Sequence, residues 1–244
     1  MRCIIQLLFS GALVVAAGCG ASDEPPKPLS AHYDEANIGM VDVNQRQPEF
    51  AAQQDWNVAR AQNMQADAQV KDAQQKLGIA RNDAKAVHLG VDSAKTTKQS
   101  ADMSNDTNRI NDAAKQLNTA TDLAKAADAR VHYLEVYVHY MERYLRWTQE
   151  NMYFREAQFE NAKATIGQRN NIAPKGVVYD SFPKQMQDRE HRTAAAKSTY
   201  EGQRQPTEGA RDNWLKLQTQ ADSENGKPGT YWDPLAPQAG PAVP

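Results

Sequence analysis

The chain has 244 residues, with 28 lysines and arginines against 30 aspartates and glutamates, and a formal net charge of −2 at pH 7. This balance excludes the basic surface with which proteins bind nucleic acids, so we expect no nucleic-acid partner. Between about residues 50 and 166 the chain is rich in Ala, Gln, Asn, Asp and Lys and almost devoid of Gly and Pro. Such a composition favours long helices over strands.

The first 18 residues have the layout of a secretory signal peptide. The basic Arg2 precedes an apolar run from Cys3 to Ala17 that is too short and too weakly flanked to remain as a membrane span. Removal of residues 1–18 would leave Cys19 as the one cysteine of the mature chain. A lone cysteine forms neither an intramolecular disulfide nor a thiolate metal cluster, so both are excluded.

The end of this segment, Val15-Ala16-Ala17-Gly18-Cys19, resembles the lipobox of bacterial lipoproteins. It departs from the commonest form of the motif, because Ala16 stands where leucine is most frequent. The resemblance implies that the Cys19 thiol carries a diacylglycerol, a covalent acyl lipid that would anchor the chain to a membrane. In that family an aspartate directly after the cysteine commonly signals retention in the inner membrane. Gly20 stands there instead, which favours the outer membrane of a Gram-negative envelope, facing the periplasm. The alternative is an ordinary signal peptide with a chance cysteine.

Two polar, proline-bearing stretches flank the part of the chain that we expect to fold. Residues 19–48 contain few large apolar side chains, which predicts a lipidated, flexible tether. Such a tether could reach on the order of 90 Å when fully extended. Residues 223–244 end in PLAPQAGPAVP, which predicts a disordered, extended tail. Residues 49–222 form the predicted helical domain.

Two long series of mostly apolar residues, spaced alternately four and three apart, predict a coiled coil. The first series, in which only Asn63 is not apolar, is Ala52, Trp56, Ala59, Asn63, Ala66, Val70, Ala73, Leu77, Ala80, Ala84, Val87, Val91 and Ala94. The second series is Ile110, Ala113, Leu117, Ala120, Ala124, Ala127, Val131, Leu134, Val138, Met141, Leu145, Thr148 and Met152, and it resumes after Arg155 with Phe159, Ala162 and Ile166.

The two series are out of phase, which predicts a reversal of the chain between them. Residues 103–108 contain helix-capping and turn residues, Ser104 to Asn108. We therefore predict an antiparallel helical hairpin that turns near 103–108; a continuous helix with a phase slip is the alternative. Near the turn the series are mostly alanine, which buries little area, so we expect a thin two-stranded arm that thickens away from the turn.

A third helix is predicted from Pro183 to Ala221, after a connecting loop over 167–182. We expect Pro206 and Gly209 to interrupt or kink it. The predicted fold is therefore all-α: an elongated antiparallel coiled-coil hairpin with a third helix that thickens its base.

A stripe of aromatic residues on the predicted second helix is a candidate site. It repeats at four- and three-residue intervals beside the coiled-coil face: Tyr133, Tyr137, Tyr140, Tyr144 and Trp147. A helix with two neighbouring apolar faces usually has two partners, so we predict that the third helix covers the stripe around Tyr200, Trp214 and Leu217. The alternative is an exposed docking face for a protein or ligand, since Tyr and Trp are favoured at interface hot spots.

His132 and His139 are weak candidates for metal ligands. They lie seven residues apart, which is too far for the paired histidines of a zinc-binding helix. The Glu-x-x-His motif of di-iron bundles does not occur in the sequence. We therefore expect no metal, and no cofactor beyond the covalent lipid.

Catalytic motifs are missing from the sequence. It contains no Gly-rich phosphate loop, no G-x-S-x-G motif and no cysteine available as a nucleophile. The sequence thus predicts a non-enzymatic, lipid-anchored coiled-coil protein of the bacterial cell envelope that acts as a structural spacer or adaptor. Its expected partners are the membrane, through Cys19, and a protein or second copy of the chain, through the coiled coil. The alternatives are a binding module that uses the aromatic stripe, a helical membrane-active protein and a metal-binding bundle.

Overall fold

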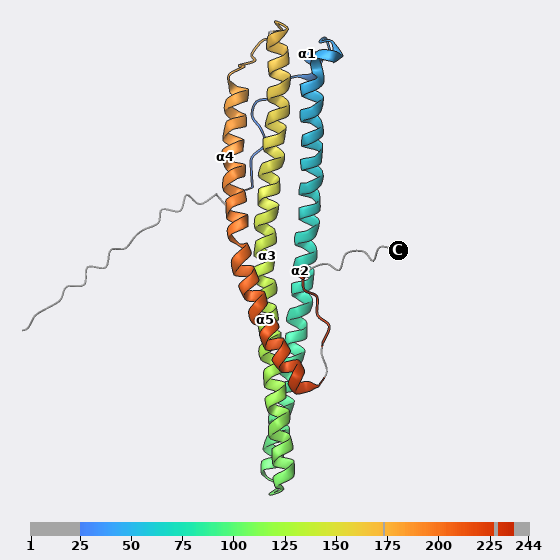
Figure 1. The fold of residues 1–244 in the computed structure, drawn as a ribbon, viewed down its shortest axis with the longest axis vertical. Helices are drawn as coiled ribbons and strands as arrows, with labels where there is room; N and C mark the ends of the chain where they lie inside the picture. The colour runs from blue at the N-terminus through green and yellow to red at the C-terminus, as the bar shows by residue number, and fades with distance from the viewer. Residues whose placement is uncertain (1–24, 173, 227–228, 237–244) are drawn as a thin grey trace, which may run out of the picture.

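The computed structural model describes residues 25–172, 174–226 and 229–236, so the predicted signal peptide and lipobox lie outside the described residues. In chain order its elements are α1 (Glu35–Ile38), the 3-10 helix η1 (Val43–Arg46), α2 (Gln47–Asp102), α3 (Thr107–Arg169), α4 (Ser181–Gly202) and α5 (Arg204–Asn225) (Figure 1). The described residues contain no strand, and none of their helices is long and apolar enough to cross a membrane. The predicted all-α fold is confirmed.

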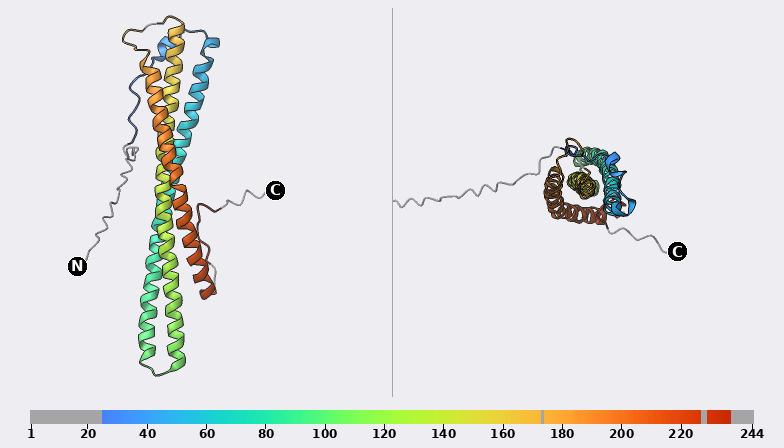
Figure 2. Two further views of the ribbon diagram at one scale, coloured as in Figure 1. Left: turned by 60° about the vertical axis from the view of Figure 1, so that its left-hand side comes forward. Right: turned by 90° about the horizontal axis from the view of Figure 1, so that it is seen from above.

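Helices α2 and α3 form the predicted hairpin. They run side by side in opposite directions for most of their length (Figures 1 and 2). The Asp106 side chain begins α3 by accepting hydrogen bonds from the backbone N–H groups of Asn108 and Arg109, at 3.0 and 3.3 Å. Asn105 has a φ of 54°, a left-handed conformation that asparagine tolerates in a turn. The alternative of one continuous helix is wrong.

The two predicted series form the interface between α2 and α3. Their buried members include Ala59, Ala66, Val70, Ala73, Leu77, Ala80, Ala84 and Val91 on α2 and Ala113, Ala124, Leu134, Val138, Met141, Phe159 and Ile166 on α3. Asn63, the polar member of the first series, meets Thr148 of the second, with 3.2 Å between its amide oxygen and the threonine hydroxyl. Pairing polar residues at one level disfavours other registers, in which each would face an apolar side chain.

Helices α4 and α5 thicken the base and pack on α3 (Figure 2). The break between them lies at Gln203, whereas Pro206 and Gly209 lie inside α5. The predicted break at those two residues is therefore misplaced. Pro206 belongs to the first turn of α5, where a backbone N–H has no partner within the helix, so proline is tolerated there.

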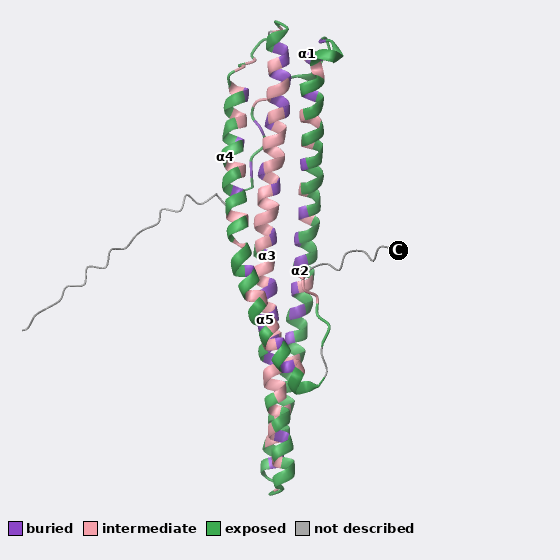
Figure 3. Ribbon diagram, viewed as in Figure 1, coloured by how far each residue is buried: buried purple, intermediate pink, exposed green. Residues whose placement is uncertain are grey.

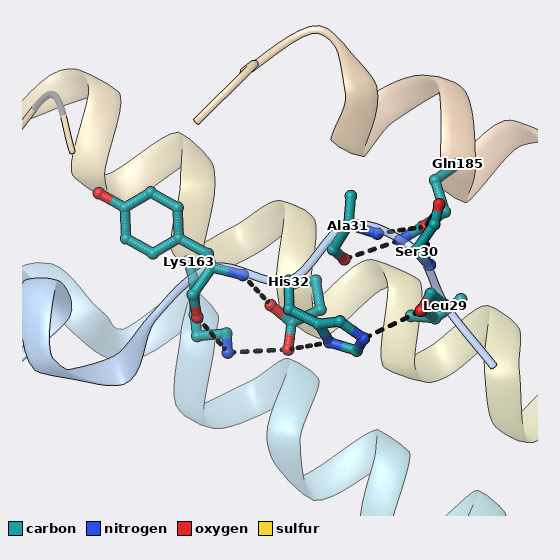
Figure 4. Close-up of polar contacts among 8 residues, drawn as sticks. Leu29, Ser30, Ala31, His32, Lys163 and Gln185 are labelled. Carbon is teal, nitrogen blue, oxygen red and sulfur yellow. Dashed lines mark hydrogen bonds and ion pairs between the residues drawn. The ribbon is translucent and has the colours of Figure 1, made fainter. Parts of the chain in front are cut away.

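The described part of the predicted tether is ordered, so the prediction of flexibility is wrong from residue 25 onward. Leu29, Tyr33, Ile38 and Val41 are all buried. Residues 27–33, here called the N-terminal strap, run beside α3 and α4 (Figure 4). These few apolar side chains dock the segment although its composition is polar.

Side chains of α3 and α4 bind the backbone of the N-terminal strap. The Gln185 amide oxygen accepts hydrogen bonds from the Ser30 and Ala31 N–H groups at 2.9 Å each, and its NH₂ donates to the Ala31 carbonyl at 3.0 Å (Figure 4). On α3, Glu160 accepts from the Tyr33 N–H at 2.6 Å, and Lys163 donates to the Tyr33 carbonyl at 2.9 Å. These contacts satisfy backbone groups that burial would otherwise leave unpaired.

We expect the Gly167→Ala substitution to destabilise the base. A Cβ at position 167 would clash with the hydroxyl end of the buried Tyr33 ring, so that ring would have to move. Alanine is ordinarily better than glycine inside a helix by about 1 kcal/mol. The clash should outweigh this gain in helix propensity and lower the free energy of unfolding by about 1–3 kcal/mol. Urea denaturation measures the change.

The matched control is Gly78→Ala in the middle of α2, where a Cβ would meet nothing within 4 Å. This variant should gain about 0.5–1 kcal/mol from helix propensity alone. Equal stabilisation by both substitutions would show that the strap does not pack on Gly167.

Candidate functional site

The aromatic stripe on α3 meets α4 and α5 at its two ends. Tyr133 is fully buried and stacks on Trp214 of α5, with ring centroids 5.4 Å apart and planes 11° apart. Trp147 stacks on Tyr200 of α4 at 5.8 Å and 4°. Both ends of the stripe thus pack against the chain itself, at two of the positions named from the sequence; Tyr133 is buried there, whereas Trp147 is half-buried.

The middle of the stripe is only half-buried. Tyr200 lies against both Tyr140 and Tyr144, with ring centroids 4.9 and 5.2 Å apart, and its hydroxyl is 2.7 Å from that of Tyr140. These rings border a groove of about 580 Å³, here called the aromatic groove. Its lining includes Tyr137, Tyr140 and Tyr144 of α3, Tyr200 of α4, Gln65, Gln69 and Asp72 of α2, and Trp232.

The C-terminal segment supplies one wall of this groove. Residues 229–236, here called the C-terminal strap, lie in the region predicted to be a disordered tail, and that prediction is wrong for this part. Asp233 accepts hydrogen bonds from the Tyr133 hydroxyl and from Arg211 Nε, each at 2.7 Å. Trp232 meets the Tyr137 ring edge-on, with centroids 5.9 Å apart. The signal for this docking was the Tyr-Trp-Asp cluster at 231–233 in a region otherwise rich in Pro and Gly.

Tyr133, Tyr137, Tyr144 and Tyr200 hold their phenol protons more tightly than a free tyrosine does. Burial raises the pKa of Tyr133 and of Tyr200 far above the ordinary value of 10.0, and hydrogen bonds to Asp233 and Tyr140 add to this. Burial also raises the pKa of Tyr144, and burial together with the negative charge of Asp72 raises that of Tyr137. Neutral phenols can both donate and accept hydrogen bonds.

The groove therefore offers stacking and hydrogen-bonding chemistry. Aromatic faces come from α3, α4 and the C-terminal strap, amides come from Gln65 and Gln69, and Asp72 provides a carboxylate. Flat rings with polar groups around them suit a ligand that has flat or extended faces and hydroxyl or amide groups.

The two weak candidates for metal ligands, His132 and His139, do not line the aromatic groove. His132 and His139 are both exposed, and His139 Nδ1 is 3.1 Å from a carboxylate oxygen of Glu142. Among the described residues, no three His, Cys, Asp or Glu side chains are grouped closely enough to hold a metal ion. Cys19, the predicted lipidation site, lies outside the residues that the structure describes.

We expect Asp233→Ala to release the C-terminal strap. The substitution leaves the buried Tyr133 hydroxyl and the Arg211 guanidinium without their shared acceptor. The free energy of unfolding should fall by about 1–3 kcal/mol, and Trp232 fluorescence should move toward that of exposed tryptophan. As a control, Asp188→Ala on the exposed face of α4 should change stability by less than about 0.5 kcal/mol. A Trp232 emission unchanged by Asp233→Ala would contradict the role of this carboxylate.

We also expect the base to lose stability in alkali. The phenol pKa is raised in the folded chain, so the folded state holds these protons more tightly than the unfolded state. The stability that these tyrosines contribute to the folded state is fully present below about pH 10, the ordinary phenol pKa. It is lost as the pH rises further. Melting temperature and tyrosinate absorbance should be followed together across this range. In Tyr200→Phe the melting temperature should fall less steeply with pH. A fall as steep as that of the wild-type chain would contradict the role given to Tyr200.

Comparison with family models, with curated proteins and with solved structures finds no match for this chain. No residue role can therefore be carried over from a relative. The arrangement of the helices, the two straps and the aromatic groove is what indicates a function.

Proposed function

We propose that this protein is a lipid-anchored, non-catalytic adaptor of the bacterial cell envelope that contacts its partner through its coiled coil. The observation that carries the proposal is the division of the molecule into two parts. At the base, α4 and α5 pack on α3, while beyond them α2 and α3 continue alone as a two-helix arm (Figures 1 and 2). A stable base with a projecting arm is a shape suited to presenting a contact surface at a distance.

The surface of the arm supports a protein contact. Its helices carry ion pairs, such as Lys98 with Asp102 at 2.5 Å and Lys95 with Asp92 at 3.2 Å. Two large apolar side chains nevertheless face solvent there: Leu89 is 71% exposed, and Met103, in the turn, is 79% exposed. In this proposal a partner helix buries these two apolar side chains.

In this proposal the Cys19 lipid holds the protein at the membrane, on the periplasmic side of the outer membrane. The partner is another protein, or a second copy of the chain, that meets the arm or its turn. No chemical step is required of any residue, because the protein acts by holding two surfaces at a set separation.

A second function is favoured by one observation, the half-buried state of Tyr137, Tyr140 and Tyr144 in the aromatic groove. Aromatic rings left partly open beside amide and carboxylate groups are suited to ligand binding. The protein would then be a binding module at the membrane, with the arm as its support.

The adaptor proposal predicts a partner at the arm that depends on the anchor. A photo-crosslinking residue placed at Met103, in the turn, should capture a discrete protein in intact cells. Cys19→Ser should move the protein out of the membrane fraction and remove the adduct. The measurements are cell fractionation and mass spectrometry of the adduct.

The same crosslinker at Tyr144 tests the groove, and at the exposed Lys184 of α4 it serves as the control position. Adducts at Tyr144 alone would favour the binding module over the adaptor. An absence of adducts at both Met103 and Tyr144, or the same adducts at Lys184, would contradict the adaptor proposal.

A further inference from the structure

The N-terminal strap leaves the folded body at the side of the rod. Pro25, the first described residue, borders a shallow depression with His139, Arg143 and Arg146 of α3. Two residues later, the Lys27 carbonyl accepts a hydrogen bond from Arg189 of α4 at 2.5 Å. The N-terminal segment therefore joins the rod part-way along the rod's length and not at either end of the rod.

The strap is also fixed in place. Arg189 is buried, and its guanidinium also lies 3.5 Å from the buried carboxylate of Glu150. Tyr33 is held through both of its backbone groups by the buried pair Glu160 and Lys163, whose charged groups are 2.8 Å apart. Moving the strap would leave these buried charged groups without the backbone hydrogen bonds that they make to Lys27 and Tyr33, which is costly, so the point of attachment does not slide along the rod.

We infer that the rod lies along the membrane surface with its arm extended sideways. This rests on the proposed lipidation of Cys19 and follows from the lengths of chain involved. The chain between Cys19 and Pro25 reaches at most about 20 Å when fully extended. At 1.5 Å per residue, the level of Arg143 on α3 is about 40 Å from the end of that helix at Arg169 and about 55 Å from its start at Thr107.

An upright rod is incompatible with these lengths. If either end pointed at the membrane, Pro25 would stand about 40 or 55 Å above the surface, beyond the reach of about 20 Å. Neither end is suited to sink in and close the gap, because exposed polar residues lie at both, Asn105 to Asn108 at the turn and Gln168 to Asn171 at the other end. The rod axis can therefore rise from the membrane plane by no more than about 30°.

The aromatic groove stays open in this orientation. His139 and Arg143 border the depression beside Pro25, where the chain leaves the body, whereas Tyr137, Tyr140 and Tyr144 line the groove. At about 100° per residue, the two sets of residues are centred about 110° apart around the helix. The lipid thus draws one face of α3 toward the membrane and leaves the groove on a face turned away from it.

Fluorescence energy transfer from the two ends of the rod to the membrane tests the inference. The sequence has two cysteines, Cys3 in the predicted signal peptide and Cys19, so a cysteine added to the mature lipidated protein is the one free thiol for a donor dye. Donors are placed at Met103 in the turn and at the exposed Lys175 at the opposite end. The purified lipidated protein is inserted into phosphatidylcholine vesicles that carry acceptor dye on the lipid headgroups.

We expect energy transfer from both positions. Transfer from one end alone would mean an upright rod and would overturn the inference. A variant with 20 glycine and serine residues inserted after Ala21 should show lower transfer from Met103, because the longer tether frees the rod. Unchanged transfer in that variant would also overturn the inference, since something other than the tether would then hold the rod down.

Failure of the proposed lipidation is seen separately. The Cys19→Ser protein should not float with the vesicles, whereas the lipidated protein should. If both float, or neither does, the lipid anchor itself is wrong, whatever the two donor positions report.

Discussion

The need of α3 to bury several faces at once is the constraint on which the rest of the structure depends. One face carries the heptad series that packs on α2, and a second carries the aromatic stripe that meets α4 and α5. Seen end-on, α3 lies between the other long helices, which expose their polar faces to solvent (Figures 2 and 3). The outer helices have few buried residues of their own, so their stability depends on α3.

Buried charges at the base are a second constraint. They limit which segments of the chain can dock there. Glu150 lies between Arg146, at 2.9 Å, and Arg189, at 3.5 Å, and Glu160 and Lys163 bind the backbone of the N-terminal strap. A buried ion pair contributes little net stability, but a buried ion that loses its partner costs several kcal/mol, on the order of 3–5. We infer that these groups select one position for the strap and so define where the chain leaves the body.

The place where the N-terminal strap leaves the body links the fold to the proposed function. A lipid on a long flexible tether would let the body take any orientation, whereas one attached only a few residues before the strap would couple the membrane to the side of the rod. The arm would then search for partners along the membrane, and the aromatic groove would face away from it. Adaptor and binding module are compatible in this arrangement, since the adaptor uses the arm and its turn whereas the binding module uses the groove at the base.

The sequence by itself determined the helices, the hairpin turn and the interface between α2 and α3. The heptad pattern repeats over many turns, so the signal survives single exceptions such as Asn63, and the turn at 103–108 carries its own capping residue in Asp106. Only the tertiary structure decided that the two flanking segments dock, that α4 and α5 separate at Gln203, and that the middle of the aromatic stripe remains half-open. The physical reason is that docking depends on a few contacts, such as Tyr33 with Glu160 and Asp233 with Tyr133, that join residues 100 or more positions apart and leave no periodic trace in the sequence.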